Sequence, residues 1–204
     1  MPRVSDAKEK LMEAAQSLIW ESSYGATSVD DICAKADVRK GSFYHFFKSK
    51  SDLEIAALEA DWQEKKVHYN AMFSPTVPPL QRLADFFDSA YCKQSALQKE
   101  RGAVLGCPFC CVGSEVGIQD EGIREKVQEI LGRLPRYFES AIRDAHAAGV
   151  VQAPDAQAKA KLLYAYFQGT LAQARIENNL ELIRGLKAGA FELLGVSPAD
   201  LSAA

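Results

Sequence analysis

The sequence predicts an all-α protein with a small N-terminal domain and a larger helical bundle behind it. Apolar residues recur at intervals of three and four along almost the whole chain, which is the spacing of amphipathic helices. Stretches that alternate between apolar and polar residues, as half-buried strands do, are nearly absent. Prolines, glycines and capping residues divide the pattern into about nine helices. We place the domain boundary after residue 53, giving domains of residues 1–53 and 54–204.

The N-terminal domain begins with two helices that have clear start and stop signals. A first helix over residues 6–24 carries one apolar stripe and ends at Gly25. Ser28, followed three residues later by Asp31, forms a capping box that starts a second helix. This second helix is expected to run to about Ala36.

A short turn and two further helices follow. Asp37 and Val38 form the turn, and the third helix carries the residues "RKGSFYHFF". Ser49 starts a fourth, longer helix that is expected to reach about Met72. Two short helices joined by a tight turn match the helix-turn-helix, whose second helix enters the major groove of DNA.

The larger domain is expected to contain the remaining helices. The segment "SPTVPP" separates them from the fourth helix, because three prolines in five residues cannot continue a helix. The predicted helices are one that starts at Leu80 and pauses at "KERG", one after Gly106, a long one from Asp120 to Ala148, one from "APDAQ" to about Asn179, and one that ends near Leu194.

Composition narrows the functional classes. The net charge of −3 excludes a polycation, so affinity for nucleic acid must come from a local patch. No apolar run is long enough to span a membrane, and the N-terminus lacks the apolar centre of a secretory signal. A cytoplasmic protein is therefore expected, with its five cysteines as thiols. No acid–base pair, phosphate-binding loop or nucleophile motif suggests catalysis, and we predict no cofactor and no metal.

The segment between Val38 and Ser51 concentrates basic side chains and contains no acidic residue, although both flanks are acidic. A local positive field of this kind can bind phosphate, and the alternative is a solvated helix face. Phe43 and Phe47 lie four residues apart and are expected to pack inward, with Tyr44 beside the basic side chains. The basic residues are Arg39, Lys40, His45, Lys48 and Lys50.

The residues "KEKLMEAAQSLIWESSYGATSVDDICAKADVRKGSFYHFFKSKSDL", Lys8 to Leu53, closely resemble the DNA-binding domain of the TetR family of transcriptional regulators. The resemblance covers about a quarter of the chain and implies a homodimeric regulator, here expected to be a repressor, on a pseudo-palindromic double-stranded operator. The DNA-contacting residues that it implies are Ser28, Arg39, Lys40, Gly41, Ser42, Tyr44, His45 and Lys50.

Two positions depart from the family pattern. Asp37 stands where the family's turn usually has glycine, and aspartate tolerates a left-handed turn better than most side chains. Arg39 stands where the family often has a Ser or Thr cap. Such a cap contributes about 1 kcal/mol, but arginine adds a guanidinium for a phosphate or a guanine.

The resemblance also implies that the second domain binds a small-molecule effector and forms the dimer through its last two helices. Small and apolar residues at helical spacing in those helices fit a partner surface, and packing within one subunit is the alternative. The predicted interface residues are Leu163, Phe167, Leu171, Leu182, Leu186, Ala190 and Leu193. The predicted effector-binding residues are Trp62, Tyr69, Phe86, Tyr91, Cys107, Phe109, Cys110, Phe138 and Phe167.

The segment "GCPFCC" places Cys107, Cys110 and Cys111 within five positions. Gly106 and Pro108 indicate a helix start, where the helix dipole favours a thiolate, so these thiols are candidates for a chemical sensor. Lining a pocket or packing is the alternative. A thiol-disulfide or metal-handling protein is a rival function, although a zinc site needs a second pair of ligands and a thiol oxidoreductase a βαβ context.

Overall fold

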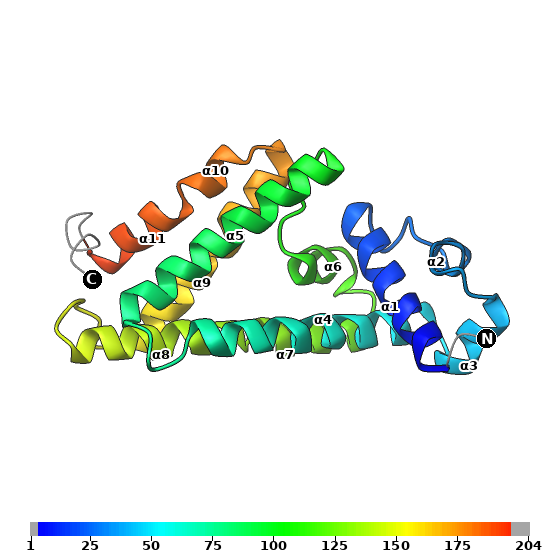
Figure 1. Ribbon diagram of the computed structural model, residues 1–204, viewed down its shortest axis with the longest axis horizontal. Coiled ribbons are helices and arrows are strands. Elements are labelled where there is room, and N and C mark those ends of the chain that lie inside the picture. Colours follow the sequence, from blue (N-terminus) through cyan, green and yellow to red (C-terminus); the bar gives the residue numbers. More distant parts are fainter. Residues whose placement is uncertain (1–3, 197–204) are drawn as a thin grey trace. The chain divides into compact units, whose positions relative to one another are not determined.

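The all-α fold is confirmed by the computed structural model, which describes residues 4–196 (Figure 1). Eleven helices and no strand occur within this range. No helix of the described range is both long and apolar enough to cross a lipid bilayer.

The chain forms two compact units that do not follow the predicted boundary. The first unit contains the chain up to Lys65 and the later segment Pro108–Leu131, and the second contains Lys66–Cys107 and the chain from Gly132 onward. The first unit thus includes two helices from the middle of the chain. Its helices are α1 (Val4–Glu21), α2 (Val29–Ala36), α3 (Lys40–Phe46), the first part of α4 (Lys50–Met72), α6 (Pro108–Val116) and α7 (Glu121–Leu131).

A small apolar core holds the short helices of the first unit in place. A helix as short as α3, with seven residues, is not stable alone in water, so its packing must stabilise it. Phe43 is fully buried and Phe47 is nearly so, which confirms that these two rings face inward. Their rings lie 5.9 Å apart. α3 packs against α1 and α2, whose buried side chains include Leu11 and Ile32.

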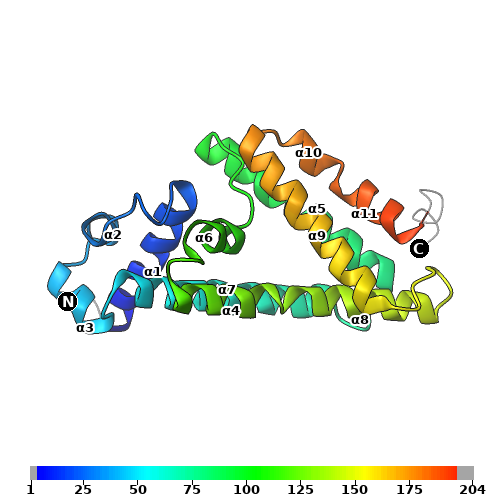
Figure 2. The same ribbon diagram turned by 180° about the vertical axis from the view of Figure 1, so that it is seen from behind.

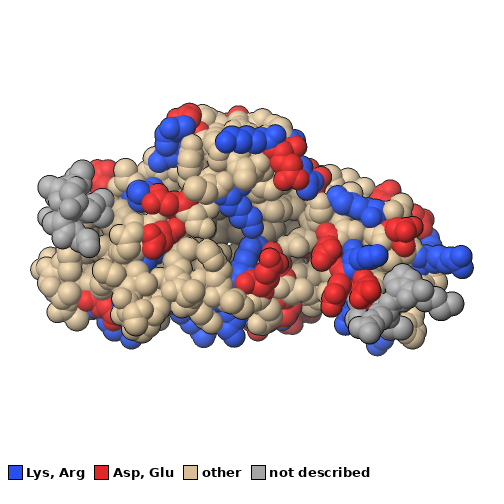
Figure 3. All heavy atoms as spheres, viewed as in Figure 1, with Lys and Arg blue, Asp and Glu red and all other residues tan. Residues whose placement is uncertain are grey.

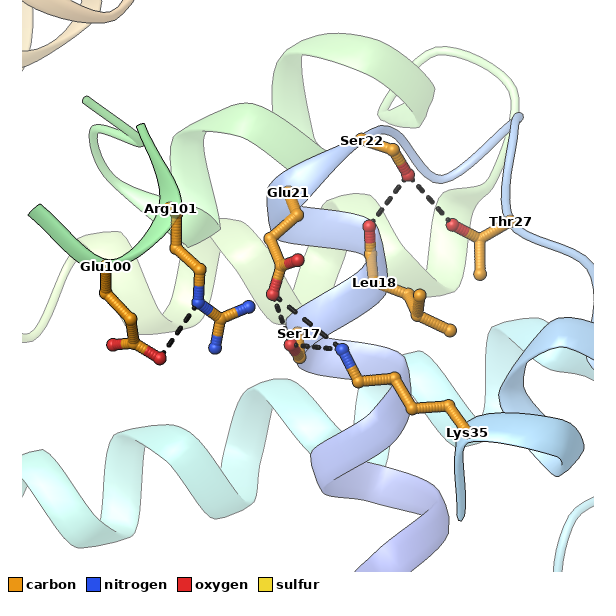
Figure 4. Close-up of polar contacts among 8 residues, drawn as sticks. All are labelled: Ser17, Leu18, Glu21, Ser22, Thr27, Lys35, Glu100 and Arg101. Atoms are coloured by element: carbon orange, nitrogen blue, oxygen red, sulfur yellow. Dashed lines mark hydrogen bonds and ion pairs between the residues drawn. The ribbon is translucent and has the colours of Figure 1, made fainter. Parts of the chain in front are cut away.

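Polar contacts fix α2 against α1 (Figure 4). The Lys35 ammonium of α2 donates to the Ser17 hydroxyl of α1 at 2.8 Å and lies 3.8 Å from the Glu21 carboxylate. At the end of α1, the Ser22 hydroxyl donates to the Leu18 carbonyl at 2.7 Å. These exposed contacts add orientation to the apolar packing rather than much stability.

The second unit has an aromatic core. Its helices are the rest of α4, α5 (Pro79–Arg101), α8 (Leu134–Ala147), α9 (Ala156–Glu177), α10 (Glu181–Arg184) and α11 (Leu186–Leu194). Figures 1 and 2 show α9 running beside α5 in both views. The Phe86 ring lies 4.9 Å from Phe138 and 5.0 Å from Phe167, so α5, α8 and α9 meet at these rings.

Two helix predictions were wrong in detail. The predicted helix from Asp120 to Ala148 is divided into α7 and α8 by Gly132 and Arg133, with Pro135 in the first turn of α8. A proline there cannot donate to the preceding turn, which explains the break. The predicted last helix is likewise divided at Gly185 into α10 and α11.

Candidate nucleic-acid interface

The helix-turn-helix of the first unit forms as the sequence predicts. The Ser28 hydroxyl accepts the Asp31 amide hydrogen at 3.1 Å, and the Asp31 carboxylate accepts the Ser28 amide hydrogen at 2.8 Å. This is the predicted capping box of α2. Asp37 ends α2 with φ 53°, in the left-handed region. This is the turn conformation that glycine usually supplies at this position of the family, and here aspartate adopts it. Arg39 occupies the N-cap of α3 without a side-chain cap bond, so its guanidinium is not needed to start the helix.

The outer face of α3 carries the predicted DNA-reading side chains. Arg39, Lys40, Gly41 and His45 are exposed, and Ser42 is half-buried. Tyr44 is 56% exposed although its ring packs edge-on against the buried Phe43 ring at 5.1 Å. The inner rings therefore hold the helix while its polar and basic groups remain accessible to a duplex.

One basic side chain of this face is already paired. The Lys40 ammonium lies 2.7 Å from the Asp30 carboxylate of α2, and this hydrogen bond raises the pKa of Lys40. Both side chains are exposed, so the pair contributes little stability. This pair leaves two ways for Lys40 to contact DNA. Either a phosphate displaces Asp30 from the Lys40 ammonium, or Asp30 stays paired and orients the Lys40 side chain toward the duplex. The sequence did not reveal this pair, because the two residues lie on different helices.

The two predicted phosphate contacts outside α3 also have partners within the chain. The Ser28 hydroxyl donates to the Asp31 carboxylate at 2.6 Å. The half-buried Lys50 ammonium donates to the carbonyls of Tyr24 and Thr27 at 2.7 and 2.8 Å. Burial lowers the pKa of Lys50. Lys50 thus supports the loop before α2, and its contact with phosphate stays a prediction.

The surface beside α3 is hollowed, with a volume of about 370 Å³. On the face shown in Figure 3, basic and acidic side chains alternate, as expected for a net charge of −3. Because the whole chain carries a net charge of −3, DNA binding must depend on the local arrangement at α3 rather than on an overall positive charge. The hollow is lined by Ala7, Asp37, Val38, Arg39, Gly41, Ser42, His45 and Phe46.

A substitution at Gly41 can distinguish a requirement of the fold from a requirement of DNA binding. A Cβ atom at Gly41 would meet no atom within 4 Å, so the protein itself does not require glycine there. Because glycine weakens a helix, Gly41→Ala is expected to raise stability by about 0.5 kcal/mol. If a DNA backbone approaches this position, the same methyl group should lower operator affinity. Thermal unfolding and DNA titration of one variant measure both effects; unchanged affinity would remove Gly41 from the interface.

A buried carboxyl group lies in α4 of the first unit. Glu54 is 2% exposed, and its Oε2 atom has no hydrogen-bond partner. Burial raises the pKa of Glu54 to about 7, against the opposing effect of Lys50, and Asp61 raises it further. Its protonation therefore changes near neutral pH.

The raised pKa of Glu54 predicts a pH-dependent stability. Because the folded pKa exceeds the unfolded one, the stabilisation is complete below about pH 4.5 and is lost as the pH rises through about 7. The loss is at most about 3 kcal/mol. Glu54→Gln should flatten the profile of unfolding free energy between pH 5 and 8 and be more stable than the wild type at pH 8. Glu64→Gln, exposed on the same helix, should keep the wild-type profile; identical profiles for all three proteins would contradict this prediction.

The predicted effector-binding residues divide between the two units. Tyr69, Phe86, Phe138 and Phe167 come together in the second unit, where the three phenylalanines are buried. Tyr91 lies at the edge of this core, under the Arg184 guanidinium at 5.5 Å, and Cys107 packs against the core. Trp62, Phe109 and Cys110 belong to the first unit. These aromatic residues lie near one another because they pack in the core. Their proximity therefore does not show a pocket, and effector binding at these residues stays a prediction.

Most of the predicted interface residues face the interior of one subunit. Leu163, Phe167, Leu171, Leu186 and Ala190 are at most 6% exposed, so they cannot form a surface for a partner. Leu182 and Leu193 are half-buried. These buried residues lie on α9 and α11, which pack against each other and against α5 and α8.

A second apolar stripe of α9 faces solvent. Its members are exposed and follow alternating intervals of four and three residues, which is the spacing of a helix–helix seam. Leu162 is 50% and Ile176 is 84% exposed. Between them, Gly169 leaves open space around its Cβ position. The stripe consists of Ala158, Leu162, Ala165, Gly169, Ala172 and Ile176.

The cysteine segment starts α6 as predicted, with Cys107 directly before the first helical residue, Pro108. Gly106 has φ 67° and its backbone is fixed by Gln94, whose side-chain oxygen accepts the amide hydrogens of Leu105 and Gly106 at 3.0 Å. Cys107, Cys110 and Cys111 are half-buried thiols. Within residues 4–196, no three potential ligands among His, Cys, Asp and Glu lie together in a way that could hold a metal ion.

An exposed recognition helix on a helix-turn-helix, followed by a larger helical unit, defines a DNA-binding protein of the regulatory class. Comparison with known families agrees with this class along both parts of the chain. The family described as "Bacterial regulatory proteins, tetR family" matches residues 11–57. The one described as "Tetracyclin repressor-like, C-terminal domain" matches residues 79–188. The chain belongs to the TetR family of bacterial transcriptional regulators, and the resemblance of Lys8–Leu53 is confirmed.

Curated relatives and a solved structure agree with the family assignment. The chain is 29% identical to the transcriptional regulator AcuR of Cereibacter sphaeroides, over 86% of this chain and 80% of that protein. It is 27% identical to the transcriptional repressor NemR of Escherichia coli K12, over 86% of this chain and 87% of NemR. The crystal structure of a regulatory protein TetR from Rhodobacter sphaeroides has a TM-score of 0.82 and 26% identity, covering 92% of this chain and 98% of that one.

Proposed function

We propose that the protein is a homodimeric repressor that binds a pseudo-palindromic operator through α3 and is released by an effector acting on the rest of the chain. The observation that carries this proposal is the outer face of α3, where basic and polar groups are exposed over two buried phenylalanine rings. A repressor among the relatives supports the direction of regulation. Because its DNA target lies in the cytoplasm of a bacterium, the protein is proposed to act there.

The exposed stripe of α9 supports the dimer. Its small residues permit close approach of a second helix, and its two large apolar residues, Leu162 and Ile176, are exposed in one subunit. An exposed apolar face on a helix is expected to be covered by a partner. A second copy fits, because a two-fold dimer presents two recognition helices to a pseudo-palindrome.

Release requires an effector that prefers a conformation with low DNA affinity. Two kinds of effector fit the segment before α6. A small molecule could bind near the aromatic core of the second unit, where Cys107 packs. Alternatively, a thiol-reactive compound could modify Cys107, whose position before Pro108 lets the helix N-terminus favour the thiolate.

The test of DNA binding uses the purified protein and a labelled DNA fragment from upstream of its own gene. We expect saturable binding at low salt that weakens steeply as salt rises, with two or a multiple of two subunits per operator. An unlabelled copy of the fragment should compete, and a shuffled fragment of equal composition should not. Equal competition by both fragments would contradict specific operator recognition.

The thiol form of release is tested with Cys107→Ser. The variant should bind the operator like the wild type, because serine keeps the size of the side chain. Addition of an electrophile such as N-ethylmaleimide should release the wild type and leave the variant bound. Cys92→Ser, which removes an exposed thiol of α5, is the matched control and should still be released. Equal release of the Cys107 variant and the wild type would exclude Cys107 as the trigger.

The rival function, a thiol-disulfide or metal-handling protein that uses Cys107, Cys110 and Cys111, is disfavoured by the family assignment over both parts of the chain. This rival function predicts that the purified protein reduces disulfide substrates and does not bind the DNA fragment. Reduction of a disulfide substrate by a protein that binds no DNA would restore it.

A further inference from the structure

The loop between α1 and α2 is held by a carboxylate from a distant part of the first unit. The two carboxylate oxygens of Glu115, near the end of α6, accept the amide hydrogens of Tyr24 and Gly25 at 2.8 and 2.7 Å. Ninety residues separate Gly25 from Glu115 in the sequence. Two consecutive amides thus bind one carboxylate, and bonds to a charged acceptor are stronger than neutral ones.

Gly25 gives this carboxylate room to approach. A Cβ atom at Gly25 would lie 3.2 Å from the Glu115 Oε1 atom, closer than an ordinary contact. α1 ends four residues earlier, at Glu21, so Gly25 does not terminate that helix. Its lack of a side chain lets the carboxylate approach the two amides, and a methyl group there would crowd it.

A cation holds the same loop through its carbonyl groups. The Lys50 ammonium donates to the Tyr24 and Thr27 carbonyls and lies 3.9 Å from the centre of the Tyr24 ring. The Glu115 carboxylate raises the pKa of Lys50 against the larger effect of burial. The loop is thus bound by an anion at its amides and by a cation at its carbonyls.

This loop leads directly into the DNA-reading element. The buried Thr27 is followed by Ser28, which caps α2, and α2 packs against α3. A movement of the loop would therefore shift the N-terminus of α2, and with it the α3 helix that packs against α2. α6, the helix that carries Glu115, starts immediately after Cys107. Its first residue therefore follows the cysteine, and Glu115 near its last residue binds the loop.

We propose that Glu115 is a positioning residue for DNA binding: its carboxylate fixes the loop before α2 in the conformation that presents α3 to the operator. The inference rests on the proposed function. It means that the position of α6 affects operator affinity through Glu115. Glu115 touches no DNA in this proposal and acts through Tyr24 and Gly25.

The sign of the effect separates positioning from simple electrostatics. Removing an acidic charge from a DNA-binding protein should strengthen binding to the polyanion. Glu115→Ala is expected to weaken operator binding about three- to tenfold instead, because two charge-assisted bonds are lost. Glu125→Ala removes the same charge from an exposed position of α7 in the same unit and should bind as well as the wild type or better.

A double-mutant cycle tests the contact itself. Gly25→Ala keeps the net charge and should also weaken operator binding, since its methyl group crowds the carboxylate. In the Glu115→Ala background the same change should have little further effect, because the carboxylate is already absent. Glu115→Gln retains one side-chain oxygen and should bind with intermediate affinity.

Amide hydrogen exchange without DNA completes the test. The Tyr24 and Gly25 amides should exchange faster in Glu115→Ala and at the wild-type rate in Glu125→Ala. Equal operator affinity and equal exchange for the two alanine variants would overturn the proposal. If the wild type itself binds no operator, the proposed function fails, and faster exchange in Glu115→Ala would still show that the carboxylate holds the loop.

Discussion

Replacing Lys40 and Tyr44 together by alanine is expected to lower operator affinity by about 100- to 1000-fold. Each subunit of the proposed dimer loses two contacts from the exposed face of α3, so four contacts of about 1 kcal/mol each disappear from the complex. The slope of log affinity against log salt should fall by about two, because two lysines no longer release counterions. Fluorescence anisotropy of a labelled operator at several salt concentrations measures both quantities.

The fold should survive this double substitution. Tyr44 is mostly exposed, and the Lys40–Asp30 pair lies at the surface, so the helical signal in circular dichroism should remain at the wild-type level. Lys161→Ala, an exposed lysine of α9, is the matched control and should leave operator affinity unchanged. A double variant that still binds the operator with wild-type affinity would remove α3 as the recognition helix.

A charge in the middle of the exposed α9 stripe is expected to abolish the dimer. Ala165→Glu would place two carboxylates in the proposed seam, and burying unpaired charges costs several kcal/mol. Sedimentation should show a folded monomer at concentrations at which the wild type is a dimer. Operator affinity should fall by at least about 100-fold, because one subunit reads only one half-site.

Gln157→Glu adds the same charge on an exposed position of α9 outside the stripe. It should remain a dimer and keep its operator affinity. A dimeric Ala165→Glu variant would show that the interface lies elsewhere, and Leu182 and Leu193 would then be the next residues to substitute.

The local signals of the first unit were sufficient to predict its helix-turn-helix. Ser28 and Asp31 form a contact within four residues, and Asp37 takes the turn conformation that its own side chain favours. Phe43 and Phe47 share a face because they lie one helical turn apart. Interactions of this kind are encoded by neighbouring residues, so a single sequence reveals them.

The orientation of α9 could not be predicted in the same way. Apolar and small residues occupy both its buried face, with Leu163 and Phe167, and its exposed stripe, with Leu162 and Ile176. A helix that is apolar on two faces gives no preference for the one that faces the core. The long-range contacts of Glu115 with the α1–α2 loop were equally hidden, since periodicity carries no information about residues ninety positions apart.

The central claim is that two copies of α3 read two halves of one operator. Hydroxyl-radical footprinting of the DNA upstream of the gene tests it most directly. We predict two protected segments related by a two-fold axis and separated by one helical turn or a multiple of it, both lost together in the variant that lacks Lys40 and Tyr44. A single protected segment, or protection that the double variant retains, would contradict the claim.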